Sequence, residues 1–237
     1  MIDFEKDFAR PGYELGRRQV KIAATFRLVY GWMCAGLALS GLVAWYTATS
    51  GLYQRILSGP VFYGCLFGEL ILVFVLSAAI NRLPLLVAYA MFAAYAALNG
   101  LTLSVIFLLY EIASVQRVFF ITAGMFGCLA VWGSVTKDDL SSVGSICGMA
   151  LWGLIIAGLV NLFLGSSRLD WILSLVGVAV FTGLTMFDAQ KIKQAAAREA
   201  LMDAASVHRV GIIGALTLYL DFINLFLYLL RLFGRRK

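Results

Sequence analysis

Long apolar segments alternate with short polar stretches along the whole chain. Seven segments of about 20 residues are almost free of charge, at approximately 28–48, 60–80, 85–109, 118–136, 143–165, 169–190 and 210–233. A helix needs about 20 apolar residues to cross the roughly 30 Å hydrocarbon core of a bilayer. Strands of a transmembrane barrel would instead give segments of about ten residues with alternating polarity. The pattern therefore predicts an all-α integral membrane protein with seven transmembrane helices.

The composition agrees with a membrane protein of one domain. The 237 residues are 62% hydrophobic and 14% charged, whereas about 25% of the residues in a soluble domain are charged. No polar stretch is long enough for a separate soluble domain. We therefore expect a charged N-terminal tail over residues 1–27 and a single seven-helix transmembrane domain over residues 28–237. The tail lacks the apolar run and cleavage site of a signal peptide.

The basic residues predict the orientation of the chain. With a cytoplasmic N-terminus, 12 of the 19 Lys and Arg residues fall on the cytoplasmic side and seven on the other side. Cytoplasmic loops carry the excess of Lys and Arg, so this orientation is favoured. The basic C-terminus leaves two alternatives, an external C-terminus after seven spans, which we prefer, or a last helix that re-enters and returns. The sequence contains no basic face interleaved with aromatic residues, so we expect no nucleic-acid partner.

The motifs of several enzyme classes are missing from the sequence. The single histidine, His208, excludes the H-E-x-x-H motif of zinc proteases, and there is no Walker loop or G-x-S-x-G elbow. The four cysteines lie in apolar segments without C-x-x-C spacing, so we expect neither a zinc site nor a disulfide framework. We therefore expect no enzymatic activity and no tightly bound cofactor. Two glycine pairs, Gly64 with Gly68 and Gly144 with Gly148, have the spacing of close helix contacts in lipid.

Ionisable side chains inside apolar segments are the remaining candidates for function. Such groups are rare and costly in a membrane and commonly mark ion or proton pathways. They are Glu69, Arg82, Asp188, Asp221 and Arg231. Asp221 lies about eleven residues inside the last segment, with apolar residues on both sides.

Each of the other four ionisable residues also has a simpler interpretation. Arg82 and Arg231 lie near segment ends, where long basic side chains can extend to the membrane surface. Asp188 precedes Lys191 by three residues and can pair with it or with Lys193 at the interface. Glu69 can be a buried structural partner. Alternatively, Glu69 and Arg231 both belong to the outer half of the bundle and can form an ion pair there.

Several long motifs resemble one family in their order along the chain. They are LNGLTLSVIF, FITAGMFG, SVTKDDLSSVGS, FTGLTMFDAQKIK and GALTLYLDFINLFLYLLRLFG, together with VYGWM in the first segment. They are similar to the Bax inhibitor-1 (transmembrane Bax-inhibitor-motif) family, in its bacterial branch. The bacterial pattern YDTQKIK reads FDAQKIK here, which keeps the acid and the lysines and loses the tyrosine hydroxyl and the threonine.

The resemblance implies a fold, an activity and a set of site residues. The last helix is expected at the centre, wrapped by the other six, in a multi-pass protein of the bacterial inner membrane. The implied activity is a pH-sensitive calcium leak, with Ca²⁺ and protons as the ions handled and with the family's acid pair at Asp188 and Asp221. Arg82 is the match for the family's basic latch. For the two acids to meet, the sixth helix must continue past Lys193 into the Ala-rich stretch that follows.

Elementary electrostatics suggests how such a pair would act. Two carboxylates that face each other at low dielectric cannot both ionise cheaply, so they tend to share a proton and titrate as a unit. Once ionised, their oxygens are hard ligands that suit Ca²⁺. Two other classes of function stay open. The chain can be a non-conducting regulator that binds membrane proteases or other membrane proteins, or a proton-coupled transporter that moves a substrate stoichiometrically.

Overall fold

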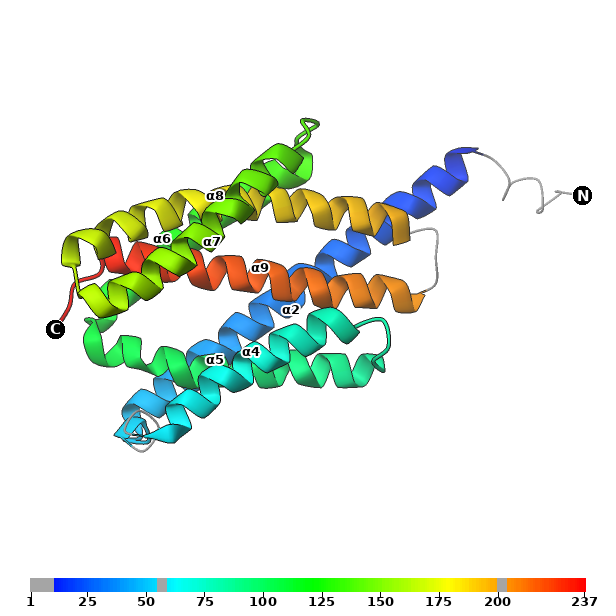
Figure 1. Cartoon of the computed structure of the whole chain (residues 1–237). Coiled ribbons are helices and arrows are strands. Elements are labelled where there is room, and N and C mark those ends of the chain that lie inside the picture. The colour runs from blue at the N-terminus through cyan, green and yellow to red at the C-terminus, as the bar shows by residue number, and fades with distance from the viewer. Residues whose placement is uncertain (1–10, 55–58, 200–203) are drawn as a thin grey trace, which may run out of the picture.

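The computed structural model describes residues 11–54, 59–199 and 204–237, and long helices make up nearly all of this part of the chain (Figure 1). The helices are α2 Pro11–Thr49, α4 Pro60–Ala79, α5 Leu85–Leu109, α6 Ile112–Val135, α7 Ser141–Leu164, α8 Ser167–Glu199 and α9 Ala204–Phe233. Each of these seven helices contains a stretch that is long and apolar enough to cross a membrane. The predicted fold class is therefore confirmed, and the chain is a multi-pass membrane protein.

Two helices extend well beyond the predicted apolar spans. Helix α2 begins at Pro11, so residues 11–27 of the predicted tail continue the first span as a helix, while residues 1–10 lie outside the described residues. Helix α8 continues past Lys193 to Glu199. The sequence QAAARE between them consists mostly of strong helix formers, which explains the extension. The long sixth helix that the meeting of the two acids requires is therefore present.

Helix α9 lies at the centre of the bundle (Figure 1). In its most apolar window, 67% of the residues are buried, compared with 6% in the corresponding window of α7. The main contacts of α9 are with four helices, α2, α5, α6 and α8, whereas α4 packs mainly on α5 and α7 mainly on α8. The predicted central position of the last helix is thus confirmed. Of the six helices expected around it, four contact α9 directly, whereas α4 and α7 lie outside this inner ring.

Glycines allow close backbone contact at several helix crossings. A Cβ atom on Gly133 of α6 would overlap the backbone carbonyl of Met186 in α8, and one on Gly144 of α7 would meet the Phe187 ring. In each of the two predicted glycine pairs, only one glycine lies against a side chain of a neighbouring helix. Gly68 and Gly144 face neighbouring side chains, whereas Gly64 and Gly148 face open space. Spacing alone therefore does not identify which glycine of a pair faces a neighbouring helix.

Candidate functional site

Asp188 of α8 and Asp221 of α9 meet between the two helices. Their carboxyl groups lie close enough for one to donate a hydrogen bond to the other when it is protonated. Because an ionised carboxylate can only accept, a hydrogen bond between two carboxyl groups requires a proton on at least one of them. Asp221 is 4% exposed, and its Oδ2 atom has no hydrogen-bond donor among the described residues. The pair is therefore arranged to share a proton.

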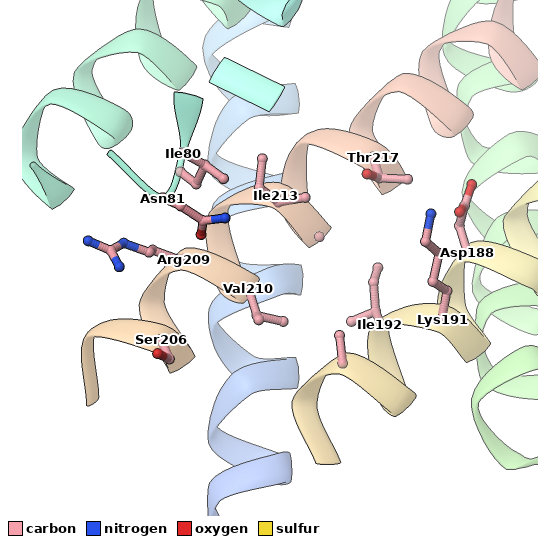
Figure 2. Close-up of a pocket in the computed structure, with 12 residues that line it drawn as sticks. Ile80, Asn81, Asp188, Lys191, Ile192, Ser206, Arg209, Val210, Ile213 and Thr217 are labelled. Atoms are coloured by element: carbon pink, nitrogen blue, oxygen red, sulfur yellow. The ribbon is translucent and has the colours of Figure 1, made fainter. Parts of the chain in front are cut away.

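A cavity with three charged side chains in a mainly apolar wall opens beside Asp188 at the end of the bundle where α8 ends and α9 begins. Its volume is about 230 Å³, and it is lined by residues of α8, α9 and the turn between α4 and α5. Figure 2 shows the Lys191 ammonium group directed toward the same side as the Asp188 carboxylate, whereas the Arg209 guanidinium points away from it. Lys191 interacts electrostatically with Asp188. Asp188 thus faces both its partner acid and a cation on its own helix, and only Asp188 of the pair lines the cavity.

The structure does not bring Arg82 to the aspartates. Helix α4 ends at Ala79, so Arg82 lies in the turn that follows, where it is exposed and does not line the cavity. This turn instead contributes Ile80 and Asn81 to the cavity wall (Figure 2). Within the described residues the Arg82 side chain forms no ion pair, which is the arrangement expected for a base that extends to the membrane surface. The cation next to the acid pair is Lys191.

Gln190, two residues after Asp188, connects α8 to the loop between α6 and α7. Its Nε2 donates to the carbonyl of Asp138 at 2.7 Å, and its Oε1 accepts from the Leu140 amide at 3.0 Å. Gln190 is 6% exposed. The motifs KDDL and FDAQ are therefore in direct contact through one side chain, two residues from Asp188. We did not single out Gln190 from the sequence, although it lies inside a quoted motif.

The predicted outer ion pair between Glu69 and Arg231 is not formed. Glu69 of α4 accepts hydrogen bonds from Asn99 Nδ2 at 3.2 Å and from Thr102 Oγ1 at 2.9 Å, both on α5. Arg231 Nη1 instead lies 3.7 Å from Asp170 Oδ1, in the first turn of α8. The reason is the packing order, because α4 packs mainly on α5 and the last turn of α9 lies beside the start of α8.

Glu69 is one end of a buried chain of hydrogen bonds that joins four helices. Asn99 on α5 donates to Glu69 and accepts from the Tyr219 hydroxyl of α9 at 2.8 Å. The Tyr219 hydroxyl lies 2.7 Å from Ser40 Oγ on α2. Tyr219 is fully buried, two residues before Asp221. These uncharged polar residues within apolar segments were missed because only ionisable groups were counted at that depth.

Replacing Tyr219 with phenylalanine should destabilise the protein by about 1–3 kcal/mol, the usual cost of leaving buried polar partners unsatisfied. The change leaves the Asn99 oxygen without its donor and removes one partner of Ser40. Thermal unfolding in detergent measures the effect. Tyr228→Phe on the same helix is the matched control, because the Tyr228 side chain makes ring contacts but no hydrogen bond within the described structure. Equal melting temperatures for the two variants would contradict the network.

Comparison with known proteins agrees with this architecture. Residues 22–237 match the family described as inhibitor of apoptosis-promoting Bax1. The inner membrane protein YbhL of Escherichia coli K12 is 48% identical over 211 residues, which cover 88% of this chain and 90% of that protein. An uncharacterised protein of Deinococcus radiodurans is 44% identical over 208 residues, 87% of this chain and 88% of its own length. The chain belongs to the Bax inhibitor-1 family.

Proposed function

We propose that this chain is a pH-sensitive calcium leak channel of the bacterial inner membrane, gated by the proton shared between Asp188 and Asp221. The observation that carries the proposal is the close approach of two acids on different helices, one buried and the other lining a cavity. When one of them is protonated, it can donate a hydrogen bond to the other. Such a bond holds α8 and α9 together only while a proton is present. Proton occupancy and helix position are therefore linked at one point of the bundle.

Loss of the shared proton would change the forces at this point. Two negative charges in contact repel strongly at low dielectric, so α8 and α9 would separate or a cation would enter between the carboxylates. Carboxylate oxygens suit Ca²⁺, which prefers about six to eight oxygen ligands, so water would complete the shell of an ion held by two acids. The Lys191 ammonium group, which is directed toward the same side as the Asp188 carboxylate, would offset part of the negative charge that then arises (Figure 2). Calcium and protons should then compete for the same pair.

Calcium flux into dye-loaded liposomes tests the proposal. The full chain is reconstituted, and flux is measured over a pH series, with protein-free liposomes as the control. We expect flux that increases with pH through a single apparent midpoint, and a midpoint that moves to lower pH as calcium is raised, because the two ions compete. Absence of flux at every pH would reject conduction and favour the regulator that binds membrane proteases or other membrane proteins. Flux in fixed proportion to a counter-moving proton would indicate a transporter.

We also propose that the N-terminus lies in the cytoplasm, as the distribution of basic residues predicts. Exposed Lys137 in the α6–α7 loop and exposed Arg168 at the start of α8 then lie on opposite sides of the membrane. Single cysteines at these positions, in a chain whose four native cysteines are replaced, distinguish the two sides. An impermeant thiol reagent added outside intact cells should label Arg168→Cys and spare Lys137→Cys. The opposite labelling would reverse the orientation.

A further inference from the structure

A second cavity lies at the other end of α8 and α9, away from the aspartate pair. Its volume is about 440 Å³, and its wall is formed by the α7–α8 connection, the first turns of α8, the last turn of α9 and the segment that follows α9. Two arginines, Arg231 and Arg236, line it together with one acid, Asp170. The lining thus carries a net charge of +1, and the remaining polar groups are hydroxyl and amide side chains such as Ser166, Ser174 and Asn161.

The two guanidinium groups have unused hydrogen-bonding capacity. Arg231 lies 3.7 Å from Asp170, which is longer than a hydrogen bond, and its other contact is with the Tyr228 ring. Arg236 lies over the Tyr110 ring, 5.9 Å from the ring centre. Neither guanidinium donates a hydrogen bond to another described residue, although each carries five N–H donors. The N–H donors of both guanidinium groups are therefore available to an acceptor that enters the cavity.

Backbone hydrogen bonds hold Arg236 in place. The chain after α9 turns back onto the α5–α6 connection, where the Glu111 amide donates to the Arg235 carbonyl at 3.0 Å and the Lys237 amide donates to the Leu109 carbonyl at 3.0 Å. The Arg235 amide donates to Ser114 Oγ at 2.9 Å. These bonds lie on both sides of Arg236 and fix its position relative to Arg231. A site that is already fixed loses less conformational entropy when a ligand binds.

The surroundings place this cavity at the headgroup level of a bilayer. Phe163, 91% exposed, and Leu164, 65% exposed, end α7 next to the cavity. Trp171 in the cavity wall is 58% exposed, and tryptophan is enriched where the hydrocarbon meets the headgroups. Guanidinium groups bind phosphate oxygens through paired, charge-assisted hydrogen bonds. We propose that this cavity binds the phosphate of an anionic phospholipid headgroup, with Arg231 and Arg236 as its donors.

Binding of matched lipids to the full chain in detergent tests the site. Phosphatidylglycerol and phosphatidylcholine with identical acyl chains are titrated, and bound lipid is counted by native mass spectrometry. We expect phosphatidylglycerol to bind more tightly. Arg231→Gln and Arg236→Gln should each weaken its binding by at least about tenfold, since each change removes charge-assisted hydrogen bonds to the phosphate. Arg168→Gln, an exposed base beside the cavity but outside its lining, should leave binding unchanged.

Asp170→Asn provides a test that misfolding cannot imitate. Removing the one carboxylate from an anion site should tighten phosphatidylglycerol binding, whereas a merely structural acid would give no gain. Equal binding of the two lipids, wild-type binding by the double arginine variant, or unchanged or weaker binding by Asp170→Asn would each overturn the proposal. Inorganic phosphate separates a lipid site from a site for free phosphate. If it binds as tightly as phosphatidylglycerol, the site is one for small anions and the lipid assignment is wrong.

Discussion

Replacing Asp221 with asparagine should abolish most of the pH dependence of calcium flux. In the wild-type chain, loss of one shared proton can change the open population by at most about tenfold per pH unit. Asparagine has nearly the same shape and can still donate a hydrogen bond to Asp188, so the fold should persist. It cannot lose a proton, so repulsion between two carboxylates no longer arises. We therefore expect flux to stay near its low-pH level, with a slope against pH close to zero.

The same measurement on Asp188→Asn and on a matched control makes this result specific. Asp188→Asn removes the other half of the pair and should flatten the profile in the same way. Asp138→Asn removes an exposed carboxylate from the loop that Gln190 contacts and should keep the wild-type profile. If both pair variants retained the wild-type dependence on pH, the gate assignment would be wrong and the hydrogen bond between the acids would be structural.

Hydropathy predicted the helices because the bilayer imposes a length on every span. The third segment was placed at residues 85–109, and α5 is Leu85–Leu109. The predicted helix ends were less accurate for α2 and α8, which extend beyond the hydrocarbon core. Polar residues can continue a helix outside the membrane, and hydropathy does not detect that part. The meeting of Asp188 and Asp221 depended on motif resemblance and on the Ala-rich continuation of α8. Hydropathy alone placed Asp188 near the surface.

The charged partners were harder to predict, because sequence position gives the depth of a residue but not the neighbour it faces. Glu69 and Arg231 were assigned to the same half of the membrane, yet they belong to helices whose main contacts are with other elements. Asp170 pairs with Arg231 instead because the first turn of α8 lies beside the last turn of α9. For the same reason Arg82 was assigned to the acids, whereas the structure agrees with the other interpretation of Asp188, in which it interacts with Lys191 three residues later.

Gly133→Ala should cause the largest loss of stability among single changes at helix crossings. The added Cβ would overlap the carbonyl of Met186, and because this atom belongs to the backbone of α8, the two helices must separate. Overpacking commonly costs about 1–3 kcal/mol, and we expect the upper end of this range because no side chain can move aside. Met186 lies two residues before Asp188. The same displacement should therefore also disturb the acid pair.

Gly127→Ala on the same helix separates this steric effect from helix propensity. A Cβ at Gly127 meets no atom within 4 Å, so alanine there should stabilise α6 by up to about 1 kcal/mol through its higher helix propensity. The two variants make the same chemical change in one helix, six residues apart in the sequence, and should shift the melting temperature in detergent in opposite directions. Equal shifts would show that α6 and α8 do not approach closely at Gly133. A loss of stability confined to Gly133→Ala, accompanied by an altered pH profile of calcium flux, would show that this crossing sets the position of Asp188.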